Sequence, residues 1–173
     1  MALTKVIGSG LGAIPAISGA NLTGLTDSQM PAGSVLQTLH AESTSTVNST
    51  SSSYADTGFN LSITPSSTSN NILIQFEFTT YMFGNNDDTE VASAYKFVRD
   101  STDIKAFEDS SGYTTKVERS ANNYWEAFRT NFTHLDSPST TSAVNYKLQF
   151  AQKLGGQLTI KGVTKIILME IAG

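Results

Sequence analysis

The chain has 173 residues and a formal net charge of −4, and only 15% of its residues are charged. A mildly acidic chain with so few charges lacks the clustered cations that nucleic acid or anionic lipid requires. It contains no cysteine, which excludes disulfides, thiolate metal sites and cysteine nucleophiles. No apolar run approaches the ~18 residues of a membrane-spanning helix. Residues 1–30 also lack the basic start and continuous apolar centre of a signal peptide.

The composition favours a β-rich fold. Ser and Thr together make up 44 residues, about a quarter of the chain, and Val, Ile, Tyr and Phe are plentiful. Such residues suit pleated strands joined by short polar turns. Disorder is the competing interpretation of so much Ser and Thr, but a hydrophobic fraction of 39% argues against it for most of the chain.

Residues 1–32 form a separate segment, in which only Lys5 and Asp27 are charged. Frequent glycines and Pro15 prevent a continuous helix. One extended strand cannot bury scattered apolar side chains by itself, so this segment is either a solvated tail or an extended arm that orders against another chain. Its shortage of charge favours the arm. The candidate contact residues of the arm are its apolar ones: Val6, Ile7, Leu11, Ile14, Ile17, Leu22 and Leu25.

Strand signals begin at residue 33. The clearest strand is 71–83, where Ile72, Ile74, Phe76 and Phe78 fall on one face and the residues between them fall on the other. The Ser- and Thr-rich segment 43–53 fits either a loop or a strand with hydroxyl-rich faces, and the sequence does not separate the two. Sequential strands without intervening helices predict an antiparallel β-sandwich of eight or nine strands, resembling a jelly roll, over residues 33–173. The predicted strands are 34–42, 59–63, 71–83, 91–99, 104–107, 124–135, 144–150, 158–161 and 164–171.

Motifs that suggest nucleotide binding or nucleophilic catalysis are weak. The glycines of residues 8–12 match neither the dinucleotide fingerprint nor the P-loop. His134, Asp136 and Ser137 lie almost side by side in the sequence, whereas a catalytic triad must converge in space. The sequence therefore predicts a surface strand that ends in a turn.

Metal binding and acid–base catalysis also lack support. His40 and His134 are the only histidines, so one chain cannot supply a histidine-rich site, although three copies around an axis could each contribute one. The oxygen-rich segment 85–90 lacks EF-hand spacing. Nothing pairs the remaining carboxylates at glycosidase distances. We expect no catalytic, cofactor-binding or metal-binding residues, and the carboxylates considered are Asp100, Asp103, Glu108, Asp109 and Glu118.

A candidate binding site involves Tyr113, Tyr124 and Trp125, in or beside the Gly-, Asn- and Ser-rich segment 109–123. An exposed aromatic ring can cover the apolar face of a sugar while neighbouring amides reach its hydroxyl groups. Packing in the core is the expected place for Trp125, and receptor contact is the alternative.

Several phrases resemble small tail-fibre and virion structural proteins of tailed bacteriophages, especially marine and cyanobacterial ones. They are MALTKVIGSGLG (1–12), IPAISGANLTGL (14–25), PAGSVLQTLH (31–40), DTGFNLSITPSSTSNNILIQF (56–76), FVRDST (97–102), LDSPSTTSAVNYKLQ (135–149) and IILMEIAG (166–173). The resemblance implies a trimeric virion appendage. Its N-terminal arm would contact its copies or other virion proteins of the tail or capsid, and its β-sandwich head would face outward.

The resulting hypothesis is a non-enzymatic virion protein, a short fibre or spike whose head binds the host surface through a glycan or another envelope component. Many weak sites on one particle would supply avidity. The alternative is a protein that decorates or cements the capsid through its arm. An enzyme that degrades host polysaccharide is a third class, and it lacks an organised acid–base pair.

Overall fold

The computed structural model describes residues 29–85, 90–118 and 123–173. The chain divides into two units, Met1–Met30 and Pro31–Gly173. Nearly all of the first unit lies outside the described residues, so the arm predicted for residues 1–32 stays a prediction. The same holds for all of its candidate contact residues, which lie outside the described residues: Val6, Ile7, Leu11, Ile14, Ile17, Leu22 and Leu25.

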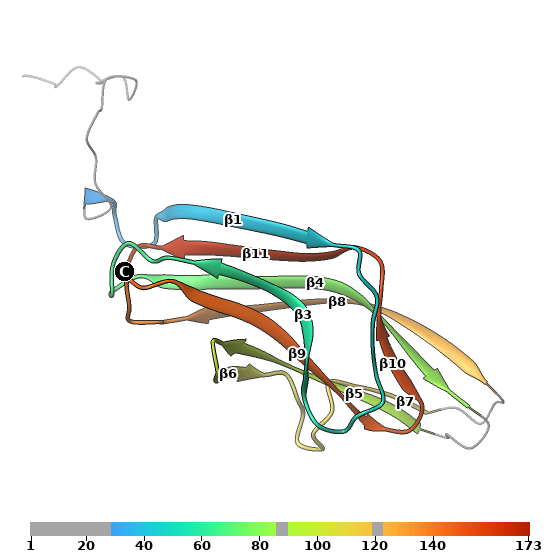
Figure 1. The fold of residues 1–173 in the computed structure, drawn as a ribbon. Helices are drawn as coiled ribbons and strands as arrows, with labels where there is room; N and C mark the ends of the chain where they lie inside the picture. The colour runs from blue at the N-terminus through green and yellow to red at the C-terminus, as the bar shows by residue number, and fades with distance from the viewer. Residues whose placement is uncertain (1–28, 86–89, 119–122) are drawn as a thin grey trace, which may run out of the picture. The chain divides into compact units, whose positions relative to one another are not determined.

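The second unit is built from β-strands in two antiparallel sheets (Figure 1). Sheet A contains β1 (Val35–Ser43), β2 (Val47–Ser49), β4 (Asn71–Gly84), β8 (Tyr124–Asp136), β10 (Gln157–Ile160) and β11 (Thr164–Ile171). Sheet B contains β3 (Ala55–Ile63), β5 (Glu90–Arg99), β6 (Thr102–Ala106), β7 (Thr115–Glu118) and β9 (Val144–Leu154). None of the described residues lies in an α-helix.

The connectivity of the unit is that of a jelly roll. Without the short strands β2, β7 and β10, sheet A has the order β1-β11-β4-β8 and sheet B the order β3-β9-β5-β6. Successive strands cross repeatedly from one sheet to the other, as in two Greek keys folded together. The predicted fold class, an antiparallel jelly-roll sandwich, is confirmed.

The predicted number of strands is too low, because the described residues form eleven. Strand β7 lies in the Gly-, Asn- and Ser-rich segment 109–123, for which the sequence predicts no strand, and β2 lies in the segment 43–53, for which the sequence leaves a loop and a strand both open. Each has three or four residues and one apolar side chain facing the core, Val117 in β7 and Val47 in β2. Alternation cannot be recognised over so few residues.

Strand β4 is the centre of sheet A. One of its edges pairs with β8 from Ile72 to Gly84, and the other pairs first with β11 and then with β10. Its side chains alternate between the core and the outer face along all fourteen residues. The predicted alternation of Ile72, Ile74, Phe76 and Phe78 is confirmed, since all four are fully buried.

Strand β1 departs from its predicted pattern. Strict alternation along the predicted strand 34–42 would place Val35, Gln37, Leu39 and Ala41 on one face. Leu39 and Ala41 pack against the core, but Val35 is 53% exposed. The pairing of β1 with β11 shifts register between Val35 and Gln37. A bulge of this kind changes the direction in which the following side chains point.

Aromatic rings from both sheets fill the core. Phe76 and Phe78 of β4 lie 5.0 Å and 5.2 Å, centroid to centroid, from Phe97 and Tyr95 of β5. The hydroxyl of Tyr95 lies 2.8 Å from Oγ1 of Thr80, so its polar atom is satisfied. Burial raises the pKa of Tyr95 to about 12, which keeps this hydroxyl neutral at ordinary pH.

A buried carboxylate closes one end of the core. Glu170 of β11 is 1% exposed. Its carboxylate accepts hydrogen bonds from the side chains of Gln37 and Asn70, and from both the backbone N–H and the hydroxyl of Ser66, at 2.6–2.7 Å. Desolvation alone would raise the pKa of Glu170, but these bonds outweigh it and hold the pKa below the ordinary value. Glu170 therefore joins β1, β11 and the turn before β4.

The core assignment of β4 makes a first prediction. Replacing Ile74 with Asp buries a charge without a partner, so we expect Ile74→Asp to lose the cooperative unfolding transition in urea. Gln75→Asp is the control, because Gln75 lies on the outer face next to it and this variant should still unfold cooperatively. Cooperative unfolding of Ile74→Asp would contradict the assigned register.

The Glu170 network makes a second prediction. We expect Glu170→Gln to lower the free energy of unfolding at pH 7 by about 1–3 kcal/mol, because an amide group then faces the donors. The folded-state pKa of Glu170 is lowered. Its stabilisation is therefore complete above the ordinary glutamate pKa and is lost as the pH falls through the folded-state value.

Urea unfolding at pH 7, 5 and 3 would measure the difference in free energy of unfolding between wild type and Glu170→Gln. These pH values lie on both sides of the ordinary glutamate pKa of about 4.3. Glu42→Gln is the matched control, since the Glu42 side chain is 48% exposed. A difference between wild type and Glu170→Gln that is independent of pH would contradict the assignment.

Candidate functional site

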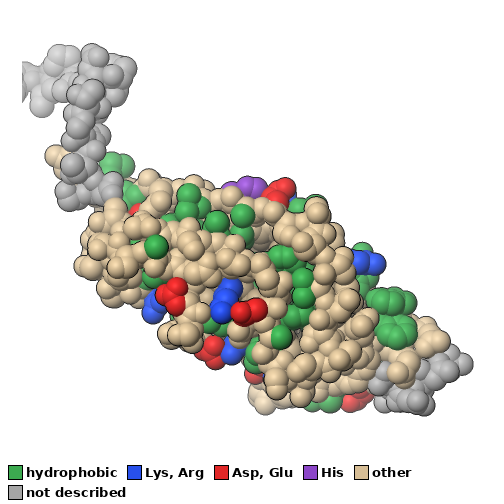
Figure 2. Space-filling model, viewed as in Figure 1, with side chains coloured by type: hydrophobic (Ala, Val, Ile, Leu, Met, Phe, Trp, Pro, Cys, Tyr) green, Lys and Arg blue, Asp and Glu red, His purple; other side chains and the backbone are tan. Residues whose placement is uncertain are grey.

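Three aromatic side chains lie on the outer face of sheet A, where β4 ends and β8 begins. Tyr81 and Phe83 alternate with core-facing residues of β4, and the strand register pairs Phe83 with Trp125 of β8. The ring centroids of Phe83 and Trp125 are 4.7 Å apart. Trp125 is 56% exposed. We call Tyr81, Phe83 and Trp125 the aromatic platform, and Figure 2 shows hydrophobic side chains gathered toward this end of the unit.

A basic side chain lies over the aromatic platform. Lys161 follows β10, and its backbone N–H donates to the carbonyl oxygen of Thr79 at 3.3 Å. The Lys161 ammonium nitrogen lies 4.2 Å from the ring centroid of Tyr81 and 6.0 Å from that of Trp125. A cation over an aromatic face is attracted by the electron density of the ring. Strands β4 and β8 supply the three aromatic rings, and Lys161, the residue after β10, supplies the positive charge beside them.

A hollow of about 250 Å³ adjoins Phe83 and is lined by Phe83, Asn85, Gly156 and Gln157. The turn before β10 packs closely against β4 here. Gly156 has a φ of +64°, and a Cβ at this position would lie 1.8 Å from the carbonyl oxygen of Phe83. Only glycine permits this approach. Because Gln157 pairs with Phe83, its amide lies beside the Phe83 ring. An amide next to an aromatic ring suits a polar ligand with one apolar face.

The structure separates the three aromatic residues that the sequence grouped. Tyr124 faces the core and is 9% exposed. Its ring lies over Gly84, where an added Cβ would approach the ring to within 2.4–2.6 Å. The expectation that Tyr124 contacts a receptor is therefore wrong: adjacent residues of a strand point to opposite faces, so an exposed Trp125 requires a buried Tyr124.

Tyr113 lies in the segment before β7 of sheet B, outside the aromatic platform. It is half-buried in the turn before β7. Its carbonyl oxygen accepts a hydrogen bond from Asp109 N–H at 2.9 Å, and its own N–H donates to the Asp109 carboxylate at 3.1 Å. Tyr113 therefore does not join Trp125 in one site. The expected core location of Trp125 is also wrong, and its exposure leaves surface contact as the alternative.

Sequence reasoning missed Tyr81, Phe83 and Lys161. The signal for the two aromatic residues was present, because the alternation predicted for 71–83 places positions 73, 75, 77, 79, 81 and 83 on one face. Lys161 carried no such signal. It approaches Tyr81 only because β10 pairs with β4, and these strands are more than seventy residues apart in the chain.

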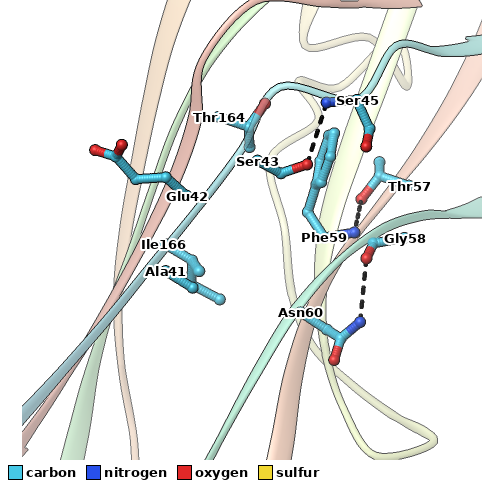
Figure 3. A pocket seen from close by; sticks show the side chains of 10 residues that line it. All are labelled: Ala41, Glu42, Ser43, Ser45, Thr57, Gly58, Phe59, Asn60, Thr164 and Ile166. Carbon is cyan, nitrogen blue, oxygen red and sulfur yellow. Dashed lines mark hydrogen bonds between the residues drawn. The ribbon is translucent and has the colours of Figure 1, made fainter.

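A second cavity of about 170 Å³ opens between β1 and β3, at neighbouring edges of the two sheets (Figure 3). Ala41, Phe59 and Ile166 supply its apolar lining. Most of its polar groups form local bonds: Ser43 and Thr57 accept from nearby backbone N–H groups, and Asn60 donates to the carbonyl of Gly58. The buried Thr164 hydroxyl has no hydrogen-bond partner among the described residues. The cavity lacks the exposed rings and the cation found at the aromatic platform.

The outer face of sheet B is polar, and several of its charges are paired. The ammonium groups of Lys96 and Lys153 each lie 4.5 Å from the centroid of the Tyr54 ring. Lys96 also pairs with Asp103 at 2.8 Å and Lys153 with Glu108 at 3.7 Å. Partial burial and a hydrogen bond to Glu108 raise the pKa of Tyr54. Paired charges at a protein surface contribute little attraction for a partner.

The buried carboxylates of the described residues have structural partners. Asp136 accepts hydrogen bonds from Arg99 and from the hydroxyl of Tyr146, both at 2.7 Å. Burial and the hydrogen bond to Asp136 both raise the pKa of Tyr146. The Ser137 hydroxyl donates to Asn71. Asp136, His134 and Ser137 therefore do not form a hydrogen-bonded triad.

Among the described residues, no group of three or more His, Cys, Asp or Glu side chains is arranged to hold a metal ion. His40 lies on the exposed side of β1, with Nε2 3.5 Å from a carboxylate oxygen of Glu42. Within the described ranges there is also no helix of sufficient length and apolar character to cross a membrane.

No protein-family model and no curated protein matches the chain. Among solved structures, it is similar to VP2 of infectious bursal disease virus in a subviral particle, with 14% identity and a TM-score of 0.40 over 81% of this chain. A structure of the Gx strain of the same virus gives 10% identity and a TM-score of 0.41 over 79% of this chain. The chain covers only 34% and 32% of those two chains, about a third of their length.

Proposed function

We propose that this chain is a non-enzymatic structural protein of a tailed-bacteriophage virion, and that its jelly-roll unit attaches the particle to a glycan on the host surface. The single observation that carries the attachment role is the aromatic platform, in which Trp125 is 56% exposed beside Phe83. The resemblance of the sequence to small tail-fibre and virion proteins supports the particle assignment.

The aromatic platform suits a sugar because its rings are held by a sheet. A pyranose presents several C–H bonds on one face, and these pack against the face of an aromatic ring. The backbones under Phe83 and Trp125 are paired strands, so little conformational entropy is lost when a ligand binds. Each site would bind weakly, and several copies on one particle would multiply the affinity.

The proposed fibre or spike is a trimer, with three copies of the chain around an axis. Among the described strands, β8 pairs only with β4 and leaves its other edge open. An open strand edge with unpaired backbone groups favours contact with another chain. Closed symmetry satisfies such edges in identical copies. The apolar residues of the arm, from Val6 to Leu25, would contact those copies or other virion proteins.

Capsid decoration is the second proposed function, and it rests on a different part of sheet A. Val35 and Leu135 are 53% and 52% exposed, and both lie at the end of sheet A far from the aromatic platform. Exposed apolar side chains of this size favour burial against another protein. Localisation of the chain on intact particles by electron microscopy separates the two functions: tail density supports attachment and density over the capsid lattice supports decoration.

The attachment proposal predicts the effect of Trp125→Ala. We expect the full-length variant to bind intact host cells at least about tenfold more weakly, because exposed aromatic anchors dominate such interfaces. Leu135→Ala is the matched control, because this exposed apolar residue lies at the opposite end of β8. Unchanged cell binding by Trp125→Ala, with the melting temperature of both variants preserved, would contradict the attachment role.

The arm proposal predicts the effect of deleting residues 1–28. The hydrogen bonds Gly33 N–H to Ala172 O at 2.8 Å and Ala172 N–H to Ser34 O at 2.9 Å remain in the shortened chain. We therefore expect the same thermal unfolding transition as in the full chain but loss from purified particles, measured by quantitative immunoblotting. Normal incorporation of the shortened chain would rule out the arm as the attachment segment.

A further inference from the structure

Lys161 places a positive charge beside the aromatic platform. Within residues 29–85, 90–118 and 123–173, no Asp or Glu side chain forms an ion pair with Lys161. Its ammonium group instead lies over Tyr81 and toward Trp125, at 4.2 Å and 6.0 Å from the ring centroids. Aromatic rings attract a cation without cancelling its charge. The ammonium group therefore remains available to an anionic partner.

The neighbouring cations on the outer face of sheet A, Arg129 and Lys165, differ from Lys161 because each has a carboxylate partner. Arg129 of β8 forms an ion pair with Glu77 of β4, and its Nε lies 2.8 Å from a carboxylate oxygen of Glu77. Lys165 of β11 lies 3.4 Å from a carboxylate oxygen of Glu42. Sheet A thus presents one cation beside exposed rings and two that have carboxylate partners.

We propose that the aromatic platform binds a carboxylate-bearing pyranose, a sugar of the uronic acid class, with its ring on Trp125 and its carboxylate on the Lys161 ammonium group. The proposal rests on the proposed function and names the ligand class of the same site. In a uronic acid the carboxylate is attached to a ring carbon, so a ring stacked on Trp125 directs this group toward the ring edge. The Lys161 ammonium nitrogen lies over the neighbouring Tyr81 ring, 6.0 Å from the centroid of the Trp125 ring, which is within reach of such a carboxylate.

The chemistry around Lys161 also argues against other anions. A polyanion such as nucleic acid or a phosphate-rich polymer requires several clustered cations. Among the described residues, the outer face of sheet A offers one cation that lacks a carboxylate partner. A single carboxylate matches a single ammonium group, and a hydrogen bond between charged partners is stronger than one between neutral groups. Gln157, which lines the hollow next to Phe83, can bond to the sugar hydroxyl groups.

The test is isothermal titration of the full-length protein with the methyl glycosides of galacturonic acid and of mannuronic acid, which carry one carboxylate each, and each is compared with its own methyl ester. The ester keeps the sugar ring and removes the charge. We expect the wild-type protein to bind at least one acid form about fivefold more tightly than its ester, the difference that one exposed ion pair supplies. Raising NaCl from about 0.05 M to about 0.5 M should reduce this preference.

Variants of Lys161 and Trp125 test which side chain produces the preference for the acid over its ester. Lys161→Gln should bind acid and ester equally while its affinity for the ester stays unchanged, and Trp125→Ala should weaken binding of both. Lys165→Gln removes a cation from the same outer face and should behave as wild type. Equal binding of acids and esters by the wild-type protein, or an acid preference that persists in Lys161→Gln, would overturn the proposal.

Different results would contradict the uronic acid ligand and the attachment role. If neither uronate binds but cell binding still depends on Trp125, the carboxylated ligand is ruled out and attachment through the aromatic platform stands. If cell binding does not depend on Trp125, the attachment role itself is contradicted. Loss of the melting transition in Lys161→Gln would instead make Lys161 a structural residue, and this too would overturn the proposal.

Discussion

Strand β4 and its two hydrogen-bonded edges determine the geometry of the jelly-roll unit. One edge pairs with β8 along nearly the whole strand, and the other pairs with β11 and then with β10. Because strand side chains alternate, the register that buries Ile74 and Phe76 also places Tyr81 and Phe83 on the outer face. A shift of one residue would reverse both faces. Core stability and the position of the aromatic platform therefore depend on the same pairing.

Close backbone packing then completes the aromatic platform. Gly84 leaves room for the buried Tyr124 ring, and Gly156 lets the turn before β10 lie directly against Phe83. The same turn leads to Lys161, whose ammonium group lies over Tyr81. Because these groups are held by strands and a tight turn, a ligand meets rings and a charge that are already in position, which lowers the entropic cost of binding.

The sequence predicted the sandwich well because long strands carry many alternating side chains. It did not predict the environment of Trp125. In 124–135, one set of alternate positions contains Trp125 and Leu135 and the other contains Phe128 and Phe132. Both faces therefore carry aromatic and polar residues, and the alternation alone does not tell which face is inside. Packing decides this, since Phe132 stacks on Phe107 with ring centroids 4.1 Å apart, which leaves Trp125 outside.

The sequence by itself determined the β class of the protein, its charge-poor character and the alternation of its longest strands, because composition and periodicity are properties of neighbouring residues. Only the tertiary structure decided that Tyr113, Tyr124 and Trp125 lie in three different environments, and that Lys161 joins Tyr81 and Trp125. These contacts join strands that are distant in the chain. Their partners depend on sheet order and register, which arise from the packing of the whole core rather than from any local segment.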